Sequence, residues 1–230
     1  MANRPVYVPM NQAPYYKAID IEFVYNRGLN IKQKQKNILA IHEIFMQRYP
    51  EKSILEISSK SLQPLGVLLS AFNLKKYVPS IQKSIPVENI YQGGKVFEQG
   101  GPFVDLYHTT AKQSKKEERL RTSGRLISYY YENEFLPLNP IETFYNWLYI
   151  NALMENQELA EQILEYNAFT DIEFNPRTAI NCQAKAAAIY IALHNLGLLD
   201  RVKDYHEFRT LFGKMEEKEL KKACHGIMAG

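Results

Sequence analysis

Apolar residues recur along this 230-residue chain with two different periods, and the balance between the two is the main constraint on its fold. Over residues 31–49, apolar side chains such as Ile38, Ile41 and Phe45 repeat at intervals of three or four positions, which is typical of a helix. Over residues 19–23, apolar side chains alternate with acidic ones, which indicates a strand. The helical period covers far more of the chain than the strand period does.

The same two patterns predict the remaining elements. Residues 1–17 contain many Pro and Tyr without a period, and we expect them to be irregular. We therefore predict an α+β fold that is predominantly α-helical with a few short strands. It would form one domain over residues 1–200, followed by a charged helical appendage over 201–230. Helices are expected over residues 64–73, 112–125, 141–165 (two helices) and 179–196, and strands over 53–57, 126–131 and 170–174.

The composition is that of a globular protein in a reducing compartment. With 46% hydrophobic and 23% charged residues the chain can bury a core, and its net charge of +3 permits a polyanionic partner without demanding one. Cys182 and Cys224 lie far apart and form no CxxC pair, which argues against a disulfide framework. The most apolar run, residues 186–193, is too short to span a bilayer. We expect a cytoplasmic protein without membrane association.

Residues 88–97 combine polar and apolar residues in a way that suggests a site. In a helix, Glu88, Gln92 and Lys95 would share one face, which would carry a carboxylate, an amide and an ammonium group. Apolar segments flank this stretch, and polar groups near a core are unfavourable unless they pair with one another or with a ligand. The alternative is a solvated network on a helix surface. Gly93 and Gly94 would weaken the helix by about 1 kcal/mol each, unless a ligand needs close approach there.

Two further groups of charged residues have both a functional and a structural interpretation. Lys115, Lys116 and Arg119 belong to a basic stretch that is either a solvated helix face or a patch that contacts phosphates. Alternation along a strand would place Asp171 and Glu173 on the same face, where burial would raise the pKa of one of them. The alternative is an exposed pair on an edge strand. The histidines are scattered without the spacing of metal ligands, so we expect no metal site.

Several of these motifs together resemble a known family. Residues 86–95 read P-V-E-N-I-Y-Q-G-G-K, which resembles the E-H-Y-F-Q-x-x-K-F signature of the NADAR family. Residues 69–72 resemble its L-S-N-F element, residues 123–125 its G-R after a basic helix, and residues 158–173 its E-L…L-L…L-V-E segment. Asn181 matches the Asn that opens the last family helix, so the resemblance covers roughly residues 65–193.

More narrowly, residues 55–66 and 170–176 are similar to the NADAR antitoxins encoded beside DarT-type toxins, which ADP-ribosylate guanine bases in DNA. The resemblance implies an antitoxin that is an ADP-ribosyl glycohydrolase. Such an enzyme removes ADP-ribose from guanine in DNA, releases ADP-ribose as product and needs neither a metal nor a cofactor. It also implies roles for individual residues: Glu88 and Lys95 in catalysis, Gln92, Ser123, Gly124, Arg125, Asp171, Glu173 and Asn181 in ligand binding, and Lys115, Lys116 and Arg119 in contacts with DNA.

Within these roles, Glu88 would stabilise the oxocarbenium-like transition state and activate water, and Glu173 would be the second acid. Lys95 would either hold a diphosphate oxygen or act as an amine on the opened sugar. Ala71 stands where the family has Asn, and the family's D-x-x-W-G motif is missing, which argues against the riboflavin-pathway activity of other members. Two other functions remain open: a non-catalytic antitoxin that binds its toxin directly, and an N-glycosidase that acts on a small aminopyrimidine ribotide.

Overall fold

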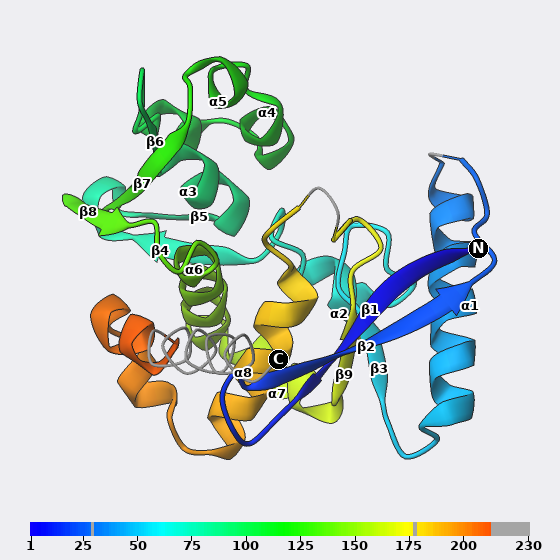
Figure 1. Cartoon of the computed structure of the whole chain (residues 1–230). Helices are drawn as coiled ribbons and strands as arrows, with labels where there is room; N and C mark the ends of the chain where they lie inside the picture. The colour runs from blue at the N-terminus through cyan, green and yellow to red at the C-terminus, as the bar shows by residue number, and fades with distance from the viewer. Residues whose placement is uncertain (29, 177–178, 213–230) are drawn as a thin grey trace, which may run out of the picture.

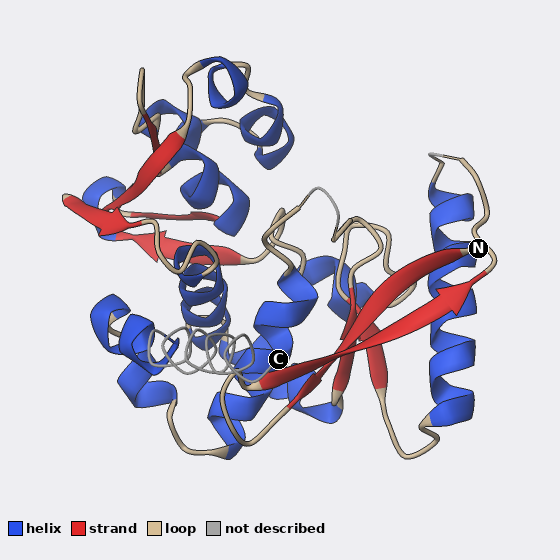
Figure 2. Ribbon diagram, in the orientation of Figure 1, coloured by secondary structure: helices blue, strands red, loops and turns tan. Residues whose placement is uncertain are grey.

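The computed structural model describes residues 1–28, 30–176 and 179–212, which form an α+β domain with more helix than strand, as predicted (Figure 1). In this part of the chain the strands form three small sheets, and helices lie around and between them (Figure 2). The largest sheet has the strand order β2-β1-β9-β3. Its strands are β1 (Ala2–Pro9), β2 (Tyr16–Phe23), β3 (Ile54–Glu56) and β9 (Ala168–Thr170).

Strand β1 lies inside this sheet, so the prediction that residues 1–17 are irregular was wrong. It pairs antiparallel with β2 along its whole length and with β9 at one position. Val6, Tyr7 and Val8 are all buried, which means that both faces of the strand are covered. A strand buried on both faces has no alternation between apolar and polar residues, and the period therefore failed to reveal it.

Two helices cover the two faces of the largest sheet. Helix α1 (Ile31–Arg48) confirms the predicted helix, and its buried residues Ile38, Ile41 and Phe45 pack with residues of β1 and β2 in a small core. Helix α8 (Gln183–Asn195) packs against β1 and β9 within the main core. Its residues from Gln183 to Leu193 are all buried, as expected for a helix at the centre of a domain.

The main core joins α8 to α6 (Thr143–Met154), whose residues from Thr143 to Leu153 are also buried. Helix α3 (Val87–Gly93) contacts α6 and connects a two-stranded sheet to a three-stranded sheet. The further strands are β4 (Lys75–Val78), β5 (Lys83–Pro86), β6 (Lys95–Phe97), β7 (Leu126–Tyr131) and β8 (Glu134–Pro137). Further short α-helices are α2 (Pro64–Leu68), α4 (Ala111–Lys116), α5 (Arg119–Thr122) and α7 (Gln157–Gln162).

Most predicted elements are confirmed, including the strands at 53–57 and 126–131 and the two helices within 141–165. The basic stretch 112–125 is two short helices rather than one. Beyond residue 200, Val202, Tyr205 and Phe208 are buried in the main core. Residues 213–230, with Cys224 and most of the expected helical appendage, lie outside the described residues. No described helix is both long and apolar enough to cross a bilayer.

Candidate functional site

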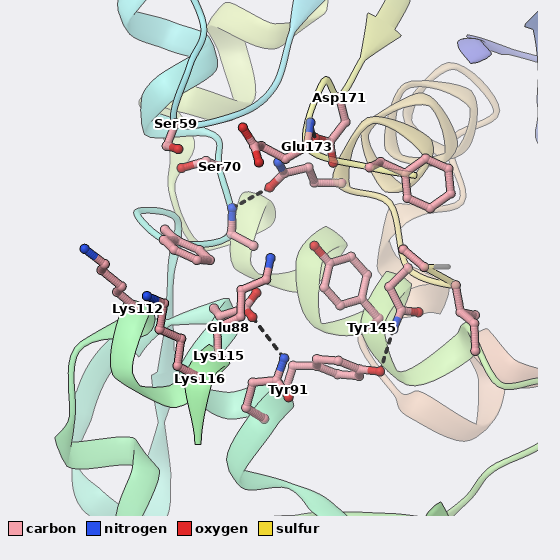
Figure 3. Close-up of a pocket in the computed structure, with 18 of the residues that line it drawn as sticks. Ser59, Ser70, Glu88, Tyr91, Lys112, Lys115, Lys116, Tyr145, Asp171 and Glu173 are labelled. Atoms are coloured by element: carbon pink, nitrogen blue, oxygen red, sulfur yellow. Dashed lines mark hydrogen bonds between the residues drawn. The ribbon is translucent and has the colours of Figure 1, made fainter. Parts of the chain in front are cut away.

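A polar cavity of about 520 Å³ lies between helix α3, helix α4 and the segment that follows β9 (Figure 3). Glu88 and Tyr91 enter it from α3, lysines line it from α4, and Asp171 and Glu173 come from the opposite wall. The cavity is formed by segments that are far apart in the sequence. The residues that line it are Ser59, Lys60, Ser70, Ala71, Phe72, Glu88, Tyr91, Gln92, Lys95, Lys112, Lys115, Lys116, Tyr145, Asp171, Glu173, Phe174, Ala179, Ile180, Asn181 and Gln183.

Glu88 lies in the first turn of α3 and is only 5% exposed. Its Oε1 accepts a hydrogen bond of 2.9 Å from Nε2 of Gln92, one helical turn further on, so the two side chains share the face predicted from their spacing. The backbone N–H of Glu88 donates to the carbonyl of Ala71 at 2.9 Å, which ties α3 to the 69–72 segment. A buried carboxylate that borders a cavity and has a single hydrogen bond from an amide side chain can still accept bonds from a ligand or a water molecule.

Lys95 lines the same cavity but does not belong to the helix, which corrects the prediction of one continuous helical face. Helix α3 ends at Gly93, and Lys95 begins strand β6. The chain leaves the helix because the backbone of Gly94 pairs with β7: its carbonyl accepts from the N–H of Tyr130 at 2.7 Å. A Cβ atom on Gly94 would lie 2.5 Å from the carbonyl oxygen of Tyr130, so only glycine fits this approach.

The environment of Lys95 changes the protonation of its amine. Its Nζ lies 4.5 Å from the centroid of the Tyr91 ring, a cation–π distance. Burial lowers the pKa of Lys95 to about 8, the carboxylate of Glu88 acts in the opposite direction, and Lys115 lowers the pKa further. An amine with this pKa is present partly in the neutral form near physiological pH, so it can act as a cation or as a nucleophile.

Tyrosines and an amide form the floor of the cavity beside Glu88. The hydroxyl of Tyr91 accepts a hydrogen bond from Nδ2 of Asn181 and lies 3.2 Å from the hydroxyl of Tyr129. Tyr145 is buried at 5% exposure and also lines the cavity. Burial, and secondarily the charge of Glu88, raises the pKa of Tyr145 well above its usual range, so this phenol is a neutral hydrogen-bonding group. Asn181 precedes helix α8 instead of opening it, because the helix begins at Gln183.

The opposite wall corrects the prediction of a strand over 170–174. Strand β9 stops at Thr170, and Asp171 and Glu173 lie in the turn that follows. Carboxylates capture the backbone N–H groups that a strand would need: Glu173 N–H donates to Oδ1 of Asp171 at 3.0 Å, and Ile172 N–H donates to Oε1 of Glu56 at 2.8 Å. Asp171 is partly buried in the cavity wall. Glu173 is exposed and forms an ion pair with Lys34 at 3.6 Å.

The outer edge of the cavity is positively charged. Lys112, Lys115 and Lys116 of α4 are exposed at this edge (Figure 3), and Lys60 also lines the cavity. Helix α4 is held against α3 by Asn89, whose Nδ2 donates to the carbonyl of Leu106 at 2.7 Å and of Thr109 at 2.8 Å and to the hydroxyl of Ser114 at 2.8 Å. We call Lys60, Lys112, Lys115 and Lys116 the lysine rim.

Four residues predicted to belong to the site lie away from this cavity. Arg119 pairs with Asp105 and Glu117, and its guanidinium stacks on Phe103 at 4.6 Å. Ser123 is buried, and Gly124 has a φ of +83°, a conformation that favours glycine. Arg125 is 80% exposed on its side chain and pairs with Glu98 at 3.0 Å. The residues brought together in the cavity are Glu88, Gln92, Lys95, Lys115, Lys116, Asp171, Glu173 and Asn181.

Sequence reasoning missed Gln183, Tyr145 and Lys60 as cavity residues. Gln183 links two segments of the cavity, since its Oε1 accepts from Ala71 N–H at 2.8 Å and its Nε2 donates to the carbonyl of Ile57 at 2.7 Å. No local pattern marks a buried glutamine in an apolar helix as a link of this kind. Lys112 lies in the basic stretch that the sequence did single out. Among the described residues, no group of three or more His, Cys, Asp or Glu side chains is arranged to hold a metal ion.

The fold and the cavity define a single α+β domain with a polar pocket of small-molecule size and a basic edge. A sequence model of the DarT1-associated NADAR antitoxins matches residues 2–222, nearly the whole chain. The protein therefore belongs to the NADAR family, in the branch of antitoxins associated with DarT1 toxins, and the family resemblance predicted from the sequence is confirmed. A search of curated proteins gave no match.

Proposed function

We propose that this antitoxin is an ADP-ribosyl glycohydrolase that cleaves the N-glycosidic bond between ADP-ribose and a guanine base of DNA, and so reverses modification by a DarT-type toxin. The observation that carries the proposal is the presence of a buried carboxylate, Glu88, and a lysine amine, Lys95, in one cavity. Family membership supports the antitoxin role, and the chemistry of the cavity supports the reaction.

In the proposed reaction the bond between C1″ of the ribose and the base nitrogen breaks, and the electron pair stays on the nitrogen. The ribose then carries positive charge, which the carboxylate of Glu88 stabilises. Water adds to C1″ and transfers its proton to Glu88. Gln92 holds Glu88 in place through its Nε2, and Oε1 of Gln92 has no hydrogen-bond partner among the described residues.

Lys95 has two chemically distinct uses in this reaction. As a cation it would bind a diphosphate oxygen. As a neutral amine it would attack C1″ of the opened sugar, form an imine and release the base before water hydrolyses the imine. Burial lowers the pKa of Lys95 to about 8, which increases the share of the neutral amine near physiological pH. Borohydride added during turnover would reduce an imine to a stable adduct on Lys95, whereas a purely cationic role would give no adduct.

The lysine rim supports a polynucleotide substrate over a small ribotide. A small ribotide would be held entirely within the cavity, and lysines beyond it would have little to bind. DNA carries a regular series of phosphates on both sides of the modified base, and the exposed lysines at the cavity edge would bind them. The roles of Lys115 and Lys116 as DNA contacts are part of this proposal.

The direct test is to incubate the protein with a guanine-ADP-ribosylated oligonucleotide and to follow the mass of the DNA. We expect unmodified DNA and free ADP-ribose to appear with the native protein and not with Glu88→Gln. If the native protein leaves the modified DNA unchanged but still silences an active toxin with which it co-purifies, the protein is a binding antitoxin. Activity on a free ribotide with none on DNA would instead indicate a small-molecule glycosidase.

A further inference from the structure

A second carboxyl group, that of Glu56, is hydrogen-bonded to the residues on both sides of Asp171, Thr170 and Ile172. Glu56 ends β3 and is paired with Thr170, which ends the parallel strand β9, so Asp171 follows at the same edge of the sheet. Glu56 is 2% exposed, and Asp171 forms part of the cavity wall. Neither carboxyl group forms an ion pair with a lysine or arginine among the described residues. Two neighbouring carboxyl groups without an ion-pair partner favour sharing one proton, because two like charges in a poorly solvated environment repel strongly.

Burial raises the pKa of Glu56, and the hydrogen bonds around this carboxyl group act in the opposite direction. Its Oε2 accepts from the hydroxyl of Thr170 at 2.6 Å, its Oε1 accepts from the N–H of Ile172 at 2.8 Å, and the hydroxyl of Ser58 is a third donor. Nε2 of His42 lies 2.8 Å from the Thr170 hydroxyl and must donate to it, because that hydroxyl already donates to Glu56. Burial lowers the pKa of His42 to about 4, so this imidazole is neutral.

Asp171 has fewer hydrogen-bond donors than Glu56, which favours placing the shared proton on Asp171. Its Oδ1 accepts from the N–H of Glu173, and the side chain of Gln183 is a second donor. Burial, and next the charge of Glu56, raises the pKa of Asp171 well above its usual range, and Lys115 opposes this effect. The titratable and charged groups that face the pair from the surrounding elements are His42 and Lys34 of α1, Lys115 of α4, Tyr145 and Tyr149 of α6, Glu173, and Cys182.

We propose that Glu56 is a positioning residue that keeps Asp171 protonated, and that Asp171 donates this proton to the base nitrogen as it leaves the ribose. The inference rests on the proposed function and adds the acid that the proposed reaction needs. The bond from C1″ to nitrogen breaks, its electron pair takes the proton of Asp171, and the added water gives a proton to Glu88. Exchange with solvent then returns a proton to Asp171 and removes one from Glu88, so the net reaction consumes one water molecule.

The positions of the carboxyl groups fit this division of roles. Glu88 and Asp171 come from opposite walls of the cavity (Figure 3), as expected for groups that act on opposite sides of a glycosidic bond. Their environments differ: Glu88 pairs with an amide, whereas Asp171 faces another carboxylate. Glu173, the acid predicted from the sequence, is exposed and forms an ion pair with Lys34.

The protonation of Asp171 can be measured without any substrate. The chain has five aspartates, Asp20, Asp105, Asp171, Asp200 and Asp204, so ¹³C-aspartate NMR gives few carboxyl signals. In a pH titration of the native protein we expect one signal to titrate far above the ordinary value of about 3.9. That signal should be absent in Asp171→Asn and should shift to lower pH in Glu56→Gln. An Asp171 signal that titrates near the ordinary value in the native protein would overturn the proposal.

The acid role is tested by the pH dependence of kcat/KM on modified DNA. At high pH kcat/KM should fall as Asp171 loses its proton. In Glu56→Gln this fall should occur at a pH that is lower by about one unit or more, whereas Glu158→Gln on α7 should not change that pH. Loss of stability without this shift would make Glu56 a structural residue only. If Glu56→Gln fails to fold, the native titration and Asp171→Asn still decide whether Asp171 is protonated. If Asp171 titrates abnormally but the protein has no glycohydrolase activity, both the acid role of Asp171 and the proposed function are refuted. The shared proton between Glu56 and Asp171 would then be the part of the inference that stands.

Discussion

Replacing Glu88 with Gln is the sharpest test of the proposed reaction, because it exchanges one carboxylate oxygen for an amide nitrogen and keeps the shape of the side chain. Glu88 is 5% exposed, and the hydrogen bond it accepts comes from Nε2 of Gln92. The carbonyl oxygen of the new amide can accept the same bond, so the position of α3 should be preserved. The variant loses the negative charge and the ability to take a proton from water. Binding of ADP-ribose should therefore change little, while turnover falls.

The size of the effect follows from the role. General-base catalysis and charge stabilisation by a positioned carboxylate contribute at least ~10²-fold to a rate. This factor corresponds to about 2.7 kcal/mol in the activation free energy, at 1.36 kcal/mol for each factor of ten. We expect kcat on the modified oligonucleotide to fall by this factor or more, measured by mass spectrometry of the DNA. The Kd for ADP-ribose, measured by calorimetry, should stay within about twofold.

A matched control exists on the surface of the same protein. Glu158 and Gln162 repeat the spacing of Glu88 and Gln92, and Nε2 of Gln162 lies 3.4 Å from Oε1 of Glu158, but this pair is exposed on α7 outside the cavity. Glu158→Gln should leave kcat unchanged. Normal turnover by Glu88→Gln would refute the reasoning, and so would an equal loss in the two variants.

Three further predictions concern charge and packing. Burial lowers the pKa of Lys95 to about 8 in the folded protein, whereas the pKa of an unfolded lysine is about 10.4. Between these two pH values the unfolded state binds more protons, so the free energy of unfolding should rise with pH. Urea titrations of Lys95→Met should lack this rise. Reversing two exposed charges of the lysine rim, Lys112→Glu with Lys116→Glu, should lower activity on DNA at least ~10-fold, with a smaller loss on a mononucleotide. An activity on DNA that does not depend on salt would contradict the phosphate role. Gly94→Ala would place a methyl group 2.5 Å from the carbonyl of Tyr130, and should lower the free energy of unfolding by about 1–3 kcal/mol; unchanged stability in chemical denaturation would contradict it.

The sequence predicted the amphipathic elements, which have one face in the core and the other in solvent. Helix α1 is such an element, since its buried residues Ile38, Ile41 and Phe45 follow the helical period. It also predicted the Glu88–Gln92 pair, because two residues four apart in a helix meet whatever surrounds them. Interactions within one element depend on local spacing, which a sequence contains in full.

Elements buried on both sides gave a weaker signal. Strand β1 was predicted to be irregular because Val6, Tyr7 and Val8 are all buried and leave no alternation. The prediction that 170–174 is a strand failed for another reason. Glu56, more than a hundred positions earlier in the chain, accepts the N–H of Ile172 and ends the strand pairing at Thr170. No local pattern contains a partner at that distance.

The sequence by itself therefore determined the fold class, the identity of the family and the carboxylate at the centre of the candidate site. Only the tertiary structure decided that Lys95 lines the cavity of this carboxylate from a strand, that Asp171 lies on the opposite wall, and that Arg119 and Arg125 are paired elsewhere. The physical reason is the range of the interactions. A helical period and a short motif are local, whereas the burial and charge that set the protonation of Lys95 and Asp171 come from segments that meet only when the chain folds.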